Sequence, residues 1–145
     1  MAHEMDQWEK KLLYIYVIGK APQFMRKKSE TWEKIVFQNA GSNTIQTHFY
    51  SPDKDEYPHG YDNIQENERY VVESVKHPTL MDDVGGVSKS RWIWRNVIEL
   101  PMHHFTNVYK FSKKHTHDET LLCAIGAYKN VRLPKEDVEG FEYDV

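Results

Sequence analysis

The sequence predicts an α/β fold, a small three-layer sandwich of helices around a mostly parallel sheet. Segments of strand character alternate with segments of helical character along the chain, which is typical of this class. The first strand-like segment, residues 12–18, is apolar at both alternating sets of positions, as in a strand covered on two faces. An α+β fold with an antiparallel sheet is the alternative, because the middle of the chain fits more than one periodicity.

The first half of the chain is predicted to form a strand, a helix and a second strand. Residues 12–18 (LLYIYVI) are rich in residues that favour strands. Residues 21–39 place most of their apolar side chains on one helical stripe, with Pro22 near the start and Gly41 beyond the end. Residues 44–50 (TIQTHFY) then have the composition of a strand, and turn-forming residues follow them.

The second half is predicted to contain two helices among shorter strands. Residues 105–111 and 131–133 have strand character. Residues 69–76 fit a strand or a helix, and we favour a strand. Residues 91–100 fit both periods, and we favour a helix that Pro101 ends. Thr116 and Glu119 have the spacing of a capping box, so the last helix is expected over residues 117–128.

Length and composition indicate one ordinary globular domain. The 145 residues suit a single domain, which we assign to residues 1–134, followed by an acidic tail at residues 135–145. The one cysteine, Cys123, excludes an internal disulfide and fits a reducing compartment, so the expected location is cytoplasmic.

The same composition limits the classes of partner. The first residues are polar and charged, which argues against a secretory signal. The longest apolar run is much shorter than the roughly 20 residues that span a bilayer, so no membrane partner is expected. A net charge of −3 argues against nucleic acid as the partner. A small molecule or another protein remains, and homo-oligomer formation is left open.

Acidic residues follow two of the predicted strands, at the ends where a parallel sheet would bind a ligand. In such sheets ligands bind at the carboxyl ends of the strands. Asp53 and Asp55, together with Tyr57, follow the strand at residues 44–50, while Asp118 and Glu119 open the last helix. If the sheet is parallel, these groups form one pocket that can bind sugar hydroxyls and stabilise a cationic transition state.

Four histidines offer a second kind of site. His103 and His104 are adjacent, and His115 and His117 are two residues apart beside two carboxylates. Imidazole and carboxylate groups can hold zinc or iron, yet the spacing completes no known metal motif. The capping box already accounts for the carboxylates, because acidic groups in a first helical turn complement the helix dipole. A metal enzyme is therefore an alternative, and no cofactor is predicted.

Several short motifs together resemble the nucleoside 2-deoxyribosyltransferase-like family. The similar segments are IYVIG at 15–19, ETWEKIV at 30–36, FYSPDKDEY at 49–57, WRNVIEL at 94–100, TNVYKF at 106–111 and LLCAIGAY at 121–128. Two departures concern the chemistry. Ala124 occupies the position of the family's nucleophilic glutamate, and Asn107 occupies the position of an aspartate.

The resemblance implies a small α/β domain that binds a nucleoside or nucleotide and, if active, transfers or hydrolyses an N-glycosidic bond. The family's carboxylate attacks C1′ of the sugar to form a covalent intermediate. Here Glu119 or Asp118 would replace the missing nucleophile. The residues expected to bind the ligand are Gly19, Asp53, Asp55, Tyr57 and Asn107.

A non-enzymatic protein-interaction module, such as a viral, phage or complex subunit, is the other main alternative. Its anchors would be exposed aromatic residues, because tryptophan and tyrosine dominate binding hot spots. The candidates are Trp92, Trp94, Tyr57 and Tyr61.

Overall fold

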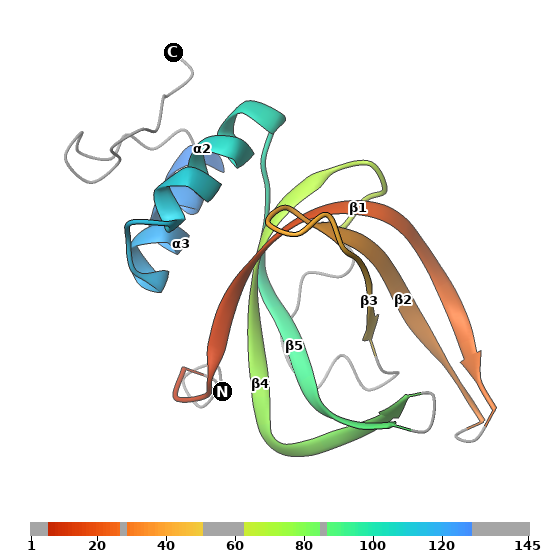
Figure 1. Cartoon of the computed structure of the whole chain (residues 1–145). Helices are drawn as coiled ribbons and strands as arrows, with labels where there is room; N and C mark the ends of the chain where they lie inside the picture. Colours follow the sequence, from red (N-terminus) through yellow and green to blue (C-terminus); the bar gives the residue numbers. More distant parts are fainter. Residues whose placement is uncertain (1–5, 27–28, 51–62, 85–86, 129–145) are drawn as a thin grey trace.

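The computed structural model describes residues 6–26, 29–50, 63–84 and 87–128. Within these ranges the chain forms a five-stranded antiparallel sheet and two helices, which is an α+β arrangement (Figure 1). The elements are β1 (Lys10–Met25), β2 (Glu30–Asn39), β3 (Ile45–Tyr50), β4 (Arg69–Val84), β5 (Val87–Glu99), α2 (Met102–Ser112) and α3 (His117–Tyr128).

The predicted three-layer sandwich with a mostly parallel sheet is wrong. The strand order is β3-β2-β1-β4-β5, and every neighbouring pair runs antiparallel. The antiparallel α+β alternative is the arrangement found. Consecutive strands are joined as hairpins, apart from the connection from β3 to β4, so the sheet lacks the crossovers that a parallel sheet requires.

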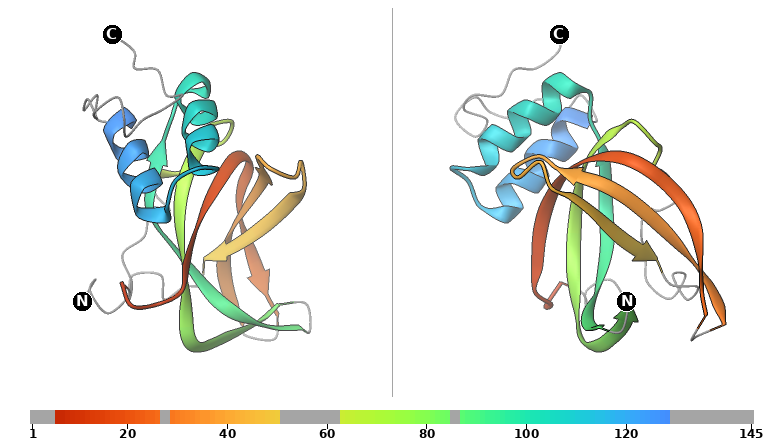
Figure 2. Two further views of the ribbon diagram at one scale, coloured as in Figure 1. Left: turned by 60° about the vertical axis from the view of Figure 1, so that its left-hand side comes forward. Right: turned by 45° about the vertical axis from the view of Figure 1, so that its right-hand side comes forward.

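The long strands bend, and the sheet curls on itself (Figures 1 and 2). Its two edge strands, β3 and β5, approach each other closely enough for His48 and Trp94 to stack. The helices α2 and α3 lie against the outer face of the curl (Figure 2). One antiparallel sheet therefore has an inner face that packs on itself and an outer face that the helices cover.

Two apolar clusters correspond to these two faces. The inner cluster draws on all five strands and comprises Ile15, Val17, Ile35, Phe37, Tyr50, Ile64, Tyr70, Val72 and Trp94. The outer cluster joins the sheet to the helices and comprises Val71, Ile98, Leu100, Phe105, Val108, Phe111, Cys123, Ala124 and Ala127. Neighbouring residues on one strand, such as Val71 and Val72, thus belong to different clusters, as strand geometry requires.

Several predicted elements are confirmed. Residues 12–18 lie in β1, residues 44–50 correspond to β3, and residues 69–76 begin β4. The helix expected over residues 117–128 is α3 with the same bounds. The predicted strand at 131–133 and the acidic tail at 135–145 lie outside the described residues.

The predicted helix at residues 21–39 is wrong, because this segment holds the end of β1 and all of β2. Trp32 is buried, and so are Ile35 and Phe37. Ile35 and Phe37 belong to the inner cluster. Trp32 lies three residues before Ile35 in a regular stretch of β2, so its side chain is on the other face of the sheet. Burial on both faces of a strand gives a spacing of three, which imitates one turn of a helix.

The predicted helix at residues 91–100 is also wrong, and a β-bulge explains why. Val71 pairs with Ile98 and Glu73 pairs with Arg95, so a single residue of β4 faces two residues of β5. The extra residue is Asn96, whose φ of 51° lies in the left-handed region that asparagine tolerates. The bulge shifts the alternation by one residue, so the apolar positions on its two sides acquire helical spacing.

The predicted strand at residues 105–111 lies in helix α2. Its buried residues His104, Phe105, Val108 and Phe111 follow a helical period. Pro101, expected to end a helix, instead precedes the first turn of this one, a position where its missing N–H is tolerated.

Candidate functional site

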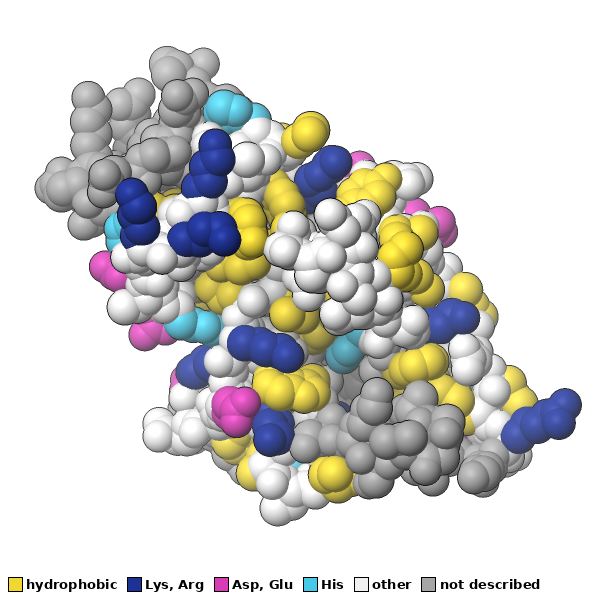
Figure 3. Space-filling view, viewed as in Figure 1, with side chains coloured by type: hydrophobic (Ala, Val, Ile, Leu, Met, Phe, Trp, Pro, Cys, Tyr) yellow, Lys and Arg dark blue, Asp and Glu magenta, His cyan; other side chains and the backbone are white. Residues whose placement is uncertain are grey.

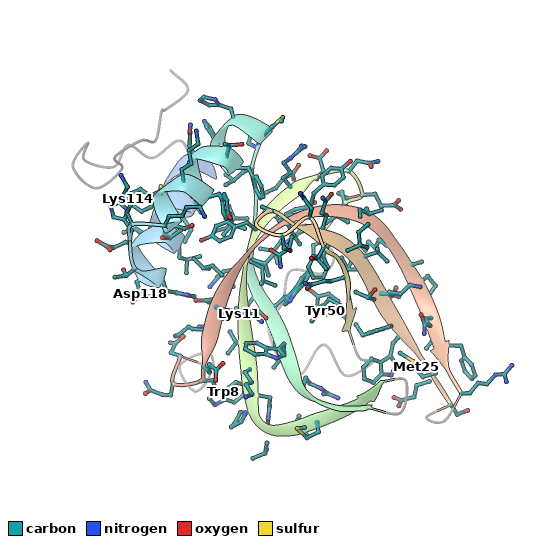
Figure 4. All side chains as sticks on the ribbon, viewed as in Figure 1. Trp8, Lys11, Met25, Tyr50, Lys114 and Asp118 are labelled. Atoms are coloured by element: carbon teal, nitrogen blue, oxygen red, sulfur yellow. The ribbon has the colours of Figure 1, made fainter. Side chains whose placement is uncertain are left out.

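The pocket predicted from a parallel sheet does not form among the described residues. Asp53, Asp55 and Tyr57 lie outside them. Gly19 lies at an irregularity in β1 and pairs with Val36 of β2, whereas Asn107 lies in α2. In Figure 4, Asp118 on α3 and Tyr50 on β3 lie on opposite sides of β1.

Glu119 and Asp118 open α3 as exposed residues, and Glu119 has a structural partner. The Thr116 N–H donates to Glu119 Oε1 at 2.9 Å, and the Glu119 N–H donates to Thr116 Oγ1 at 3.2 Å. The hydrogen bonds from the Thr116 backbone and side chain hold the pKa of Glu119 below its ordinary value. The predicted capping box is therefore confirmed, and it explains Glu119 without catalysis.

Removing the cap is expected to destabilise the protein modestly. Thr116→Ala should lower the free energy of unfolding by about 1 kcal/mol, because the hydroxyl that accepts from the Glu119 N–H is lost. Glu119→Gln should cost much less, because glutamine also serves at this position of a capping box. Urea unfolding of both variants checks this. Equal losses would contradict the capping role.

The four histidines have separate environments. His103 and His104 begin α2, with ring centroids 5.7 Å apart. His115 stacks on Phe111 at 3.6 Å and donates from Nδ1 to the Phe111 carbonyl at 2.9 Å. His117 contacts Glu73. Over the described ranges, no group of three or more His, Cys, Asp or Glu side chains is arranged to hold a metal ion.

Cys123 is unsuited to nucleophilic catalysis. Its side chain is fully buried in the outer cluster. Burial raises the pKa of its thiol to about 12, so almost none of the reactive thiolate exists at neutral pH. Two other regions carry candidate groups: the inner face of the sheet and the polar contacts between the sheet and α3.

The inner face is lined by aromatic rings from three strands. The rings of His48 (β3) and Trp94 (β5) are stacked, with centroids 4.0 Å apart and planes 6° apart. Tyr50 meets His48 edge-on at 4.8 Å, and Phe37 meets Trp94 edge-on at 5.3 Å. These contacts join the two edges of the sheet through packed aromatic side chains, of which His48 is the partly exposed one.

Polar groups accompany the rings. His48 Nε2 and the Tyr50 hydroxyl are both buried within the apolar inner cluster. Ser74, the register partner of Trp94, is also buried. An apolar site with a few placed polar groups is the usual composition of a small-molecule site.

One end of the inner face is closed by the segment that leads into β4. Ile64 is fully buried in the inner cluster. The Tyr70 hydroxyl accepts from the Gln65 N–H at 2.6 Å and donates to the Asn63 carbonyl at 3.2 Å. Lys20 Nζ donates to the Ile64 carbonyl at 3.1 Å. These bonds hold the segment of Ile64 against the inner cluster.

The opposite end of the inner face carries a cation and a further indole. Lys11 lies four residues before Ile15 along β1, which is about 13 Å of strand. Its ammonium group sits over the Trp92 ring, 4.3 Å from the centroid, and its side chain is exposed. Figure 4 shows Lys11 at the start of β1 beside β5.

On the outer face, sheet and helix meet at a buried carboxylate. Glu73 is only 2% exposed. Its Oε1 accepts from Arg95 Nε at 2.7 Å and from Asn96 Nδ2 at 2.9 Å, and its Oε2 accepts from His117 Nε2 at 2.7 Å. Arg95 also binds Asp6 at 2.8 Å. The bulge at Asn96 places two donors beside one carboxylate oxygen.

The ionised form of Glu73 is favoured by this arrangement. Burial alone would raise the pKa of Glu73, but hydrogen bonds from His117, Arg95 and Asn96, with the charge of Arg95, hold the pKa below its ordinary value. Sequence reasoning missed the network because its members come from β4, β5 and α3. The available signal was a lone glutamate between valines on one face of a strand, Val71 and Val75.

Comparisons with known proteins supply no family. No family model, curated protein or solved structure matches the chain. Among the described residues, no helix has the length and apolar character needed to cross a membrane.

Proposed function

We propose that this protein binds a small planar heterocycle carrying an anionic group, a nucleotide being the example, on the inner face of its curled sheet. The observation that carries the proposal is the stacked pair His48–Trp94, which joins the two edges of the sheet inside an apolar cluster. Flat rings bind by stacking on aromatic side chains, and His48 is the partly exposed member of this pair.

The exposed end of the inner face supports an anionic group on the ligand. Lys11 brings a positive charge there, beside the Trp92 ring. With the ring of the ligand against His48, the partly exposed member of the pair, its phosphate or carboxylate would extend toward Lys11. The proposal is limited to binding, because Asp118 and Glu119 lie on α3 at the outer face and cannot reach a ligand inside the curl.

The alternative of a protein-interaction module has less support. Trp94, one of its expected anchors, is only 1% exposed, because His48, Phe37 and Tyr50 pack around its ring. Trp92 is partly covered by Lys11. The other two anchors, Tyr57 and Tyr61, lie outside the described residues.

The test is a calorimetric titration with nucleoside monophosphates and the matching nucleosides. We expect saturable binding of at least one monophosphate and weaker binding of its nucleoside, because the nucleoside lacks the anion. Lys11→Met should weaken monophosphate binding about tenfold or more, the loss of one charge-assisted contact.

A matched control separates this site from general electrostatics. Lys113, the residue that follows α2, also lies over an aromatic ring, 4.6 Å from the Tyr109 centroid. Figure 3 shows several basic side chains at the surface of the helix pair. Lys113→Met should leave binding unchanged. The proposal fails if no monophosphate binds with a dissociation constant below about 1 mM, or if the two lysine variants lose equal affinity.

A further inference from the structure

The fully buried side chains of helix α3 are small: Thr120, Cys123, Ala124 and Ala127. Its larger apolar residues Leu121 and Ile125 pack against the outer cluster but are only partly buried, whereas α2 buries Phe105, Val108 and Phe111. Apolar stabilisation grows with the area removed from water, so α3 gains less from packing than α2 does. Helices with little buried apolar area open locally at low cost.

A polar anchor at the first turn compensates for this weak packing. His117 opens α3 and donates from Nε2 to Glu73 Oε2 at 2.7 Å. Glu73 is itself fixed by Arg95 and Asn96 through its other oxygen. The contact therefore ties the start of α3 to two strands of the sheet through one carboxylate.

We propose that Glu73 is an acid-sensitive latch: protonation of its carboxylate frees α3 from the outer face while the curled sheet stays folded. When Glu73 is protonated, one of its two oxygens carries a proton and is a poorer acceptor. Both oxygens accept hydrogen bonds in the folded protein, so at least one of these bonds is weakened. The guanidinium of Arg95 and the imidazole of His117 then lose their shared anion in a buried position, which is costly.

The charged and titratable groups around Glu73 come from β4, β5, β1, the N-terminal segment and the start of α3. Glu73 is on β4 and Arg95 on β5, and Asp6 of the N-terminal segment binds Arg95. Lys10 on β1 donates to the Asp6 carbonyl. His115, Asp118 and Glu119 flank His117 along the chain. Among these groups, Glu73 receives hydrogen bonds from three different side chains, so its protonation removes the most contacts at once.

The direction of the pH effect follows from the position of the Glu73 pKa. The folded-state pKa lies below the ordinary glutamate value of 4.5. The stabilisation is therefore complete above that value and is lost as the pH falls below it toward the folded-state pKa. The latch holds at neutral and mildly acidic pH and opens only in stronger acid.

Cys123 makes the opening measurable. It is the single cysteine of the chain and is buried on α3, so a disulfide reagent such as dithiodipyridine reacts only when the helix moves away. At pH 7 we expect Glu73→Gln to label about tenfold faster than the natural protein, since a hydrogen-bonded charge is lost. Glu30→Gln, which changes an exposed glutamate of β2, is the matched control and should label at the natural rate.

Two further measurements distinguish local opening of α3 from other causes of faster labelling. The ratio of labelling rates, Glu73→Gln over the natural protein, cancels the pH dependence of the thiol itself and should fall toward one below pH 4.5. Labelling of Glu73→Gln should depend only weakly on low urea concentrations, because local opening exposes little surface. An unchanged rate in Glu73→Gln overturns the proposal, and so does a urea dependence as steep as that of global unfolding.

Discussion

Glu73→Ala is expected to lower the free energy of unfolding by about 3–5 kcal/mol, the usual cost of removing one partner from a buried ion pair. The substitution leaves Arg95, whose side chain is 12% exposed, and His117 without their shared acceptor. It also removes the acceptor of the Asn96 amide. Urea or thermal unfolding at pH 7 measures the loss.

A combined replacement distinguishes the loss of polar contacts to Glu73 from lost packing. Glu73→Met together with Arg95→Met and His117→Leu removes all three polar groups, and buried ion networks replaced in this way often keep their stability. The combined variant should therefore recover most of the loss. A loss below about 1 kcal/mol in Glu73→Ala would contradict the network, since that is the range of an exposed ion pair.

Trp94→Ala is expected to cost about 3–5 kcal/mol, as for other large-to-small changes in a core. The indole is 1% exposed and contacts Phe37 and Tyr50 as well as His48. Its removal leaves a cavity and also removes the side-chain contacts between β5 and β3. Unfolding experiments measure the change in stability.

Trp92 provides the matched control for this change. It lies on the same strand but is only partly buried. Trp92→Ala should cost clearly less than Trp94→Ala, because less area leaves water at that position. Equal losses of stability in the two variants would mean that Trp94 is not buried in the inner cluster.

The sequence was informative where a segment's environment is simple. The capping box at Thr116 and Glu119 is a local feature, so its spacing located α3 correctly. The apolar run at residues 12–18 was correctly read as a strand, but its burial on two faces did not indicate a parallel sheet. Here a single curled antiparallel sheet is covered outside by helices and inside by itself.

The errors share a physical cause: burial patterns that depend on distant partners. The bulge at Asn96 changes the phase of β5 because of its pairing with β4. Trp32 and Ile35 are buried on opposite faces of β2, which gives helical spacing without a helix. The Glu73 network likewise depends on which strand lies beside which, so no local motif marks Glu73, whereas the capping box marks Glu119.

The contact between the edges of the sheet is best measured by proton NMR. If β3 and β5 meet as described, nuclear Overhauser cross-peaks will connect the indole protons of Trp94 with the ring protons of His48, whose centroids lie 4.0 Å apart. Assigned spectra of the folded protein that lack these cross-peaks, while those between Trp94 and Phe37 are present, would show an open sheet and remove the basis for a ligand site on its inner face.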